Sequence, residues 1–215
     1  MLKTTKQSLS VYSPVNIPLL KKVKIWLKEK YGSSYKNILH ISYVFSPIPE
    51  FNIPAVKREL FNYFSKFHSY KIKIGSVYLN KKKKFFYLKI NHPQILKMHN
   101  ELTLLVNKYR NNYFREKDLE RMKKDYYSEE ELKMLKRFGY ARVFKTFEPH
   151  ISLGDLEHNI ENINLDEILK QLQTKLHPLI NKEYLIDSAV VVYYQDSSWN
   201  TEGKFIWKNI FKLQN

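Results

Sequence analysis

The stretch Phe147-Glu148-Pro149-His150-Ile151-Ser152-Leu153-Gly154 guides the interpretation of this chain, because it has a counterpart at residues 37–45, Asn-Ile-Leu-His-Ile-Ser-Tyr-Val-Phe. Both segments carry the tripeptide His-Ile-Ser inside a short apolar run that is typical of a β-strand. Strand side chains alternate between two faces, so a histidine and a serine two residues apart point to the same side. Two such segments brought together would supply two acid/base groups and two hydroxyl donors around one small anion.

The composition is that of a folded protein. The 215 residues are 43% hydrophobic and 15% aromatic, which is enough for one sizeable core or two small lobes. The absence of cysteine excludes disulfides, thiolate metal ligands and a cysteine nucleophile. No apolar run approaches the roughly 20 residues that span a bilayer, and the first residues lack the apolar core of a secretory signal. We therefore expect a cytoplasmic protein without a membrane partner.

The formal net charge of +16 favours polyanionic partners such as RNA, nucleotides or an anionic membrane face. A general enrichment in lysine explains the same charge equally well. Charge alone therefore does not separate a nucleic-acid-binding protein from one that is merely basic.

The hydrophobic pattern predicts alternating strands and helices over the whole chain. The predicted elements are a strand at 7–12, a helix from Pro18 to Gly32, a strand at 38–45, a helix after Pro54, a hairpin of strands 70–79 and 85–90, a helix after Pro93, the strand with the second tripeptide, a helix from 164 that ends before Pro178, and strands at 185–194 and 204–213. This order predicts an α+β fold in one domain, residues 1–215, with two mirrored antiparallel lobes, outer helices and a central cleft.

Three further expectations concern side chains outside the tripeptides. The lysines of the first helix, Lys24 among them, are expected on a solvated face. Tyr43 follows the first tripeptide directly and should face away from His40. Five histidines are expected at the surface or at helix caps: His68, His92, His99, His158 and His177.

Residues 111–140 interrupt the alternation with a charge-dense segment that we interpret as a helical insertion. Ser128-Glu129-Glu130-Glu131 has the form of a capping box, which predicts a helix to about Phe138 that ends at Gly139. The insertion could be a lid over a site or a docking surface for another protein. The sequence leaves both open.

The two tripeptides, His40-Ile41-Ser42 and His150-Ile151-Ser152, resemble the paired His-x-Ser/Thr motifs of the 2H phosphoesterase superfamily. That superfamily includes the bacterial RNA 2′,3′-cyclic phosphodiesterases once called 2′-5′ RNA ligases. The segment Pro149–Gly154 is especially similar to the second motif, and the order of elements matches except at 111–140. Serine replaces the more usual threonine in both motifs and keeps the hydroxyl. The alternative interpretation is two unrelated core histidines, each hydrogen-bonded locally.

The resemblance implies a metal-independent phosphodiesterase without a cofactor. His40 and His150 would be its general acid and base, in an order that the sequence does not assign, while Ser42 and Ser152 would bind the phosphate oxygens. Further substrate contacts could come from Tyr194, Trp199 and Lys145. Ordinary packing explains the two aromatic residues as well, and an outward-facing strand charge explains the lysine.

The resemblance also implies partners and leaves alternatives. The expected substrate is RNA, an oligonucleotide with 2′-5′ linkages or a cyclic nucleotide, and we expect a monomer. The alternatives are an RNA- or nucleotide-binding module without turnover, a 2′-5′ RNA ligase, and a protein-interaction role for residues 111–140.

Overall fold

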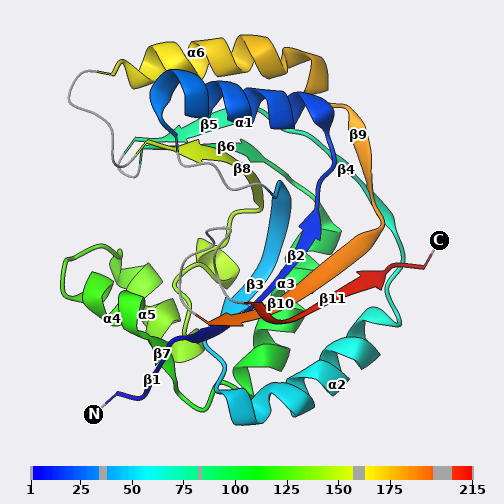
Figure 1. Ribbon diagram of the computed structural model, residues 1–215, viewed down its shortest axis with the longest axis vertical. Helices are drawn as coiled ribbons and strands as arrows, with labels where there is room; N and C mark the ends of the chain where they lie inside the picture. Colours follow the sequence, from blue (N-terminus) through cyan, green and yellow to red (C-terminus); the bar gives the residue numbers. More distant parts are fainter. Residues whose placement is uncertain (1, 34–37, 82–83, 157–162, 196–204, 215) are drawn as a thin grey trace.

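The computed structural model describes residues 2–33, 38–81, 84–156, 163–195 and 205–214 (Figure 1). Within these residues no helix is long and apolar enough to cross a membrane. The helices are α1 Pro18–Tyr31, α2 Ile53–Phe64, α3 Pro93–Asn107, α4 Glu116–Met122, α5 Glu129–Phe138 and α6 Leu165–Leu176, with 3-10 turns η1 Glu50–Asn52, η2 Phe144–Thr146 and η3 His177–Leu179. The strands are β1 Thr4–Thr5, β2 Gln7–Pro14, β3 His40–Ser46, β4 Tyr70–Lys73, β5 Val77–Asn80, β6 Phe85–Lys89, β7 Phe114–Arg115, β8 His150–Asp155, β9 Glu183–Ile186, β10 Ser188–Gln195 and β11 Phe205–Lys212.

A seven-stranded antiparallel sheet with the order β11-β10-β2-β3-β8-β6-β5 forms the centre of the molecule. Its two halves meet at β3 and β8, which are joined through the pair Ile41–Ile151. Helices α1 and α6 lie side by side over β5, β6 and β8, whereas α3 packs on β3 in the other half (Figure 1). The predicted α+β fold, with an antiparallel sheet in two halves and outer helices, is confirmed.

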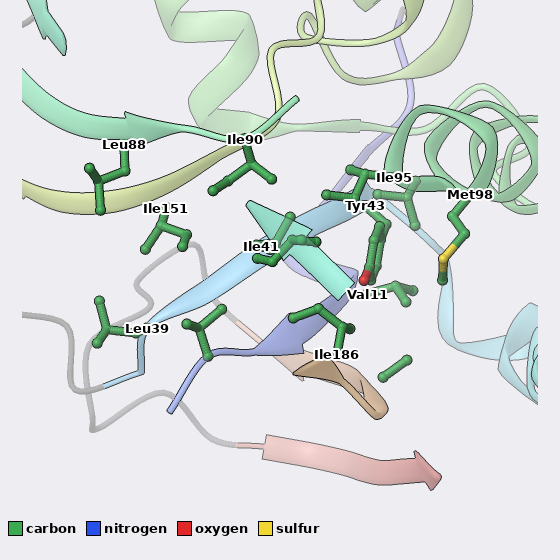
Figure 2. Close-up of a cluster of buried hydrophobic side chains, with 14 of the residues drawn as sticks. Val11, Leu39, Ile41, Tyr43, Leu88, Ile90, Ile95, Met98, Ile151 and Ile186 are labelled. Carbon is green, nitrogen blue, oxygen red and sulfur yellow. The ribbon is translucent and has the colours of Figure 1, made fainter. Parts of the chain in front are cut away.

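The two central strands alternate between core and solvent. Ile41 and Ile151 are fully buried, and the histidine and serine on either side of each are half-buried on the opposite face. Figure 2 shows both isoleucines pointing into the main core, close to Leu39 and Leu88. A slip of one residue would exchange the two faces, so these isoleucines fix the register that exposes the tripeptides.

Helix α1 approaches β8 closely where the helix ends. It stops at Gly32, whose φ of 63° is the left-handed conformation that glycine adopts without strain. A Cβ atom at Gly154 would overlap the Ser33 hydroxyl and contact Leu27. The glycine that closes the second motif therefore allows the end of α1 to pack on the strand.

The predicted strands 70–79 and 185–194 are each wrong as single strands, because each is interrupted. Strand β4 ends at Lys73 and pairs with β9 in a separate two-stranded sheet, while β5 and β10 belong to the large sheet. The first interruption lies at Gly75, whose N–H donates to the carbonyl of Lys89 at 2.9 Å. A Cβ at this glycine would lie 2.5 Å from the same oxygen, so the two backbones approach each other too closely there for any side chain.

The charged segment 111–140 contains strand β7 and the helices α4 and α5. Helix α5 begins with the capping box of Ser128 and Glu131 and ends at Gly139, whose φ is 71°. Strand β7 joins the segment to the N-terminal residues by parallel pairing with β1. A small apolar cluster of its own is built from Phe114, Leu135 and Ala141.

Candidate active site

One cavity of about 410 Å³ is lined by the histidine and the serine of both tripeptides. Its floor is the face of β3 and β8 opposite the core. Its further walls come from α1, β3 and the residues just before it, the β5–β6 hairpin, α5 and the segment between α5 and β8: Lys24, Ile38, Phe45, Asn80, Phe85, Tyr87, Glu131, Tyr140, Arg142, Thr146, Phe147 and Glu148. The segment 111–140 thus borders the cavity through Glu131 and Tyr140.

The pairing of the central isoleucines sets the arrangement of the four polar groups. Because the pairing is antiparallel, His40 and Ser152 lie on one side of this pair, and Ser42 and His150 lie on the other. The two histidines therefore lie on one diagonal and the two serines on the other. The cavity that they line has a volume of about 410 Å³, which is enough room for a phosphate group.

Both imidazole rings are oriented by the same local hydrogen bond. Nδ1 of His40 lies 3.0 Å from the carbonyl oxygen of Ile38, and Nδ1 of His150 lies 2.7 Å from that of Glu148. A carbonyl oxygen only accepts, so Nδ1 carries the hydrogen in both rings and Nε2 is the nitrogen that can exchange a proton. Each tripeptide thus holds its imidazole through the residue two positions earlier.

The surroundings of the two rings differ. The ring of Tyr12 lies 5.0 Å from that of His40. The ring of His150 meets Phe85 and Tyr87 edge to face, at 5.7 and 5.4 Å. The two aromatic rings are stacked on each other at 5.5 Å with 16° between their planes.

An ion pair at the edge of the cavity stabilises the approach to the second motif. Lys89 forms a salt bridge with Glu148, and the Tyr87 hydroxyl donates to the same carboxylate at 2.9 Å. Burial alone would raise the pKa of the Glu148 carboxyl, but these two hydrogen bonds lower it on balance. The carboxylate stays ionised and keeps Tyr87 against the His150 ring.

The pKa of His150 is lowered. Burial is the largest cause, because it disfavours the imidazolium, and the positive charge of Arg142 acts in the same direction. The hydrogen bond to the Glu148 carbonyl opposes both effects without overcoming them. His150 is therefore neutral at pH 7 and able to accept a proton.

The comparisons with known proteins identify a family and a fold. A family model described as a protein of unknown function, DUF1045, matches residues 52–200, more than half of the chain. The chain belongs to the DUF1045 family. The match includes the second tripeptide, whereas the first precedes it. No curated protein matches the sequence.

Solved structures show that this DUF1045 chain has the 2H phosphoesterase fold. E. coli LigT in complex with 3′-AMP is 10% identical, with a TM-score of 0.54, over 98% of this chain and 99% of that one. TT0787 of Thermus thermophilus is 10% identical, with a TM-score of 0.59, over 97% of this chain and 100% of that one. A structure described as a phosphoesterase gives a TM-score of 0.53 at 10% identity, over 97% and 99% of the two chains. The predicted resemblance is thus confirmed for the fold.

Two of the three other predicted substrate contacts of the DUF1045 chain are not part of the cavity wall. Tyr194 is 2% exposed and packs with Tyr12 and Phe45 in a separate cluster. Lys145 is exposed on η2 and lies outside the wall, whereas Arg142, three residues earlier, belongs to it. The third predicted contact, Trp199, lies outside the described residues.

The prediction that Tyr43 faces away from the cavity is confirmed. Its side chain is buried in the main core, and its hydroxyl donates to Ser13 at 2.6 Å. Of the histidines expected at the surface, His68 and His177 are exposed, and His158 lies outside the described residues.

The expectation that His99 lies at the surface is wrong. It is 1% exposed and its ring stacks on Phe147 at 3.6 Å. Its Nδ1 lies 2.5 Å from the carbonyl of Tyr43, and its Nε2 accepts from the N–H of Phe144 at 3.0 Å. Burial lowers the pKa of His99 to about 4. This neutral histidine joins β3 to the segment that leads into β8.

The sequence contained a signal for this position. His99 shares helical spacing with Ile95, Met98, Leu102 and Val106, all of which are buried on α3. His92, by contrast, caps the same helix as expected, since its Nδ1 accepts from the N–H of Gln94.

Lys24 is the second side chain that sequence reasoning misplaced. The solvated face predicted for the lysines of α1 is wrong at this position, because Lys24 is 4% exposed. It falls at helical spacing with Leu20, Val23 and Leu27, which form the buried stripe of α1. A lysine inside such a stripe was the available signal.

Among the described residues no group of three or more histidine, aspartate or glutamate side chains is arranged to hold a metal ion.

Proposed function

We propose that this protein is a phosphodiesterase that acts on 2′,3′-cyclic phosphates or 2′-5′-linked oligonucleotides. The observation that carries this proposal is the meeting of both His-Ile-Ser tripeptides on one face of the sheet, in one cavity. Two imidazoles with the same tautomer line this cavity together with the two serines. This is the set of groups that general acid–base cleavage of a phosphodiester requires. Neither a metal ion nor another cofactor takes part in the proposed reaction.

In the proposed reaction the nucleophile is water, for a cyclic phosphate, or the vicinal ribose hydroxyl, for a 2′-5′ linkage. The oxygen of the nucleophile bonds to phosphorus, and the Nε2 atom of one neutral imidazole takes the proton that this oxygen loses. The opposite imidazolium gives its proton to the oxygen whose bond to phosphorus breaks. The hydroxyls of Ser42 and Ser152 donate to the two non-bridging oxygens, where negative charge grows in the transition state.

The electrostatics support a division of roles between the histidines. The lowered pKa of His150 keeps this imidazole neutral at pH 7. A neutral imidazole is the form that accepts a proton, so His150 suits the role of the base for cleavage. His40 then supplies the proton to the leaving oxygen. In the reverse direction, ligation, the two roles exchange.

The wall next to His150 supports a nucleotide as the substrate. The stacked rings of Phe85 and Tyr87 are half-buried and flank the imidazole, so they offer an aromatic surface to a base. Stacking of a base on such a surface contributes roughly 1–3 kcal/mol. The cavity of about 410 Å³ is in the range of small-ligand sites. LigT, which shares the fold, was solved with 3′-AMP and with phosphate.

The proposal is tested with a panel of substrates in excess chelator: 2′,3′-cyclic and 3′,5′-cyclic nucleotides, 2′-5′ and 3′-5′ oligoadenylates, and RNA with a cyclic phosphate end. We expect turnover of the 2′,3′-cyclic or the 2′-5′-linked members. His40→Ala and His150→Ala should each reduce kcat/KM by about 100-fold or more. His177→Ala, at an exposed histidine on η3, is the matched control and should leave the rate unchanged.

The same panel separates the alternatives. Binding of these ligands by the wild type without any turnover would indicate a binding module instead of an enzyme. Joining of a 5′-hydroxyl end to a cyclic phosphate end would indicate a ligase. Cleavage at the wild-type rate by both histidine variants would contradict the proposed site.

A further inference from the structure

The buried stripe of helix α1 contains one cation, at Lys24. The other buried members of this stripe, Leu20, Val23 and Leu27, all belong to the main hydrophobic core together with Ile151. Lysine is almost never fully buried, because removing an ammonium group from water is costly unless a polar environment receives it. At 4% exposure, the side chain of Lys24 must therefore end in such an environment inside the protein.

The candidate active site is a polar environment that Lys24 reaches. Lys24 lines the same cavity as His40, Ser42, His150 and Ser152, although α1 covers the opposite, core face of β8. The junction of the two central strands accounts for this placement. They are joined through one residue pair, so beyond it the start of β3 and the body of β8 diverge. We infer that the lysine stem passes between the diverging strands and brings the ammonium group to the phosphate position.

We propose that Lys24 is a further catalytic residue, which contacts the reacting phosphate and stabilises the charge that develops on it. This proposal rests on the phosphodiesterase function proposed above. A phosphodiester carries one negative charge and its five-coordinate transition state carries nearly two. A fixed ammonium group in a site shielded from water therefore stabilises the transition state more than the bound substrate. The serines and Lys24 would then donate to the non-bridging oxygens from different sides.

The position of Lys24 distinguishes it from the other cations around the cavity. Lys89 binds Glu148 at the edge beside the β5–β6 hairpin, and Arg142 lies 3.8 Å from Glu131 of α5. Both of these cations therefore lie on the hairpin and α5 side of the cavity. Lys24 approaches from the helix layer behind the sheet, next to the tripeptides themselves.

The test uses Lys24→Met, which keeps the length of the side chain and suits a buried stripe, and Lys22→Met, a matched control on the exposed face of the same helix. Lys24→Met should lower kcat by about 10- to 100-fold with less than about a threefold change in KM, because the interaction strengthens in the transition state. Lys24→Arg, which retains the charge, should recover part of the rate. Lys22→Met should behave as the wild type.

A second measurement does not depend on turnover. Inorganic phosphate is mostly a dianion at slightly alkaline pH, so it carries nearly the charge of the transition state. Its binding to the full-length protein, followed by calorimetry, should be weakened about tenfold by Lys24→Met and unaffected by Lys22→Met. If the wild type cleaves none of the substrates but this difference in phosphate affinity is seen, the proposed function fails and the Lys24 site stands. A folded Lys24→Met protein with kcat and phosphate affinity within twofold of the wild type would overturn the inference. Should Lys24→Met not fold, Lys24→Gln must show the same losses, or the inference is overturned.

Discussion

The strands β3 and β8 carry the same tripeptide and orient its side chains in the same way. In each, the isoleucine is fully buried and the histidine and serine lie on the other face. In each, the imidazole Nδ1 donates to the carbonyl two residues earlier, at 3.0 Å in β3 and 2.7 Å in β8. Three residues and the strand backbone are thus sufficient to aim an imidazole.

The two strands differ in the side chains that surround each imidazole ring. Beside His40 in β3 lies Tyr12, from the neighbouring strand β2. Beside His150 in β8 lie two aromatic edges, the Glu148–Lys89 ion pair and the guanidinium of Arg142. The carbonyl two residues before each histidine therefore fixes which ring nitrogen carries the hydrogen, while burial and the charge of Arg142 lower the pKa of His150. Substitutions around the two rings test this asymmetry.

The experiment with the largest expected effect determines which histidine is the general acid and which is the general base. His40→Ala and His150→Ala are compared on two nucleoside 2′-phosphodiesters, one with an alkoxide and one with a para-nitrophenolate leaving group. Nitrophenolate departs without a proton. A variant without the general acid should therefore lose about 100-fold in kcat/KM on the alkoxide substrate, but its kcat/KM on the nitrophenolate substrate should be within about tenfold of the wild type. We expect this recovery for His40→Ala and not for His150→Ala.

Measurement of kcat/KM for both substrates checks the assignment. Recovery of His150→Ala alone would reverse the two roles. Equal recovery of both variants would contradict a division into acid and base and would leave the asymmetry around the rings without a catalytic consequence.

Much of this comparison was accessible from the sequence, because it rests on local periodicity. The two-residue alternation of strands predicted that histidine and serine share a face and that Tyr43 faces away. The capping box of α5 and the stop at Gly139 were predicted for the same reason, since a helix end is encoded within a few residues. The antiparallel α+β arrangement followed from the order of such elements.

The features that the sequence did not reveal depend on contacts between distant segments. Strand β4 pairs with β9, and no local pattern selects that partner. Tyr194 was a reasonable candidate for base stacking, yet its position in β10 faces a second apolar cluster. Lys24 and His99 both occupy buried helical positions, and the assumption that polar helix residues are solvated concealed them. Their helical spacing predicted burial, whereas their residue types suggested exposure to solvent.

The second prediction concerns the joint between the two halves, which His99 bridges. His99→Phe preserves the stacking on Phe147 but leaves the N–H of Phe144 and the carbonyl of Tyr43 without their hydrogen bonds to the ring. An unsatisfied buried group costs about 1–3 kcal/mol, so we expect the free energy of unfolding to fall by about 2–4 kcal/mol. Urea denaturation at about pH 7.5 measures this loss.

The same residue makes the stability depend on pH in a defined direction. The folded pKa of about 4 lies below the ordinary value of 6.5, so the unfolded chain binds the proton first as the pH falls. Stability is therefore retained above pH 6.5 and lost progressively toward pH 4. Between about pH 7.5 and 4.5 the wild type should lose roughly 2–3 kcal/mol more than His99→Phe. His177→Gln, at an exposed histidine, should keep the wild-type slope, and an equal slope in His99→Phe would contradict this origin.

The smallest expected effect tests how much the charge of Arg142 contributes to the lowered pKa of His150. Arg142 lines the cavity and its positive charge lowers the pKa of this imidazole. Arg142→Gln removes the charge, so the pKa of His150 should rise and a smaller fraction of the ring should be neutral at any given acidic pH. If His150 is the base, the acid limb of the kcat/KM profile moves to higher pH. Lys145→Gln removes the same charge at an exposed position outside the cavity wall and should leave the limb in place. An acid limb that Arg142→Gln leaves unmoved would mean that burial, and not the charge of Arg142, lowers the pKa of His150.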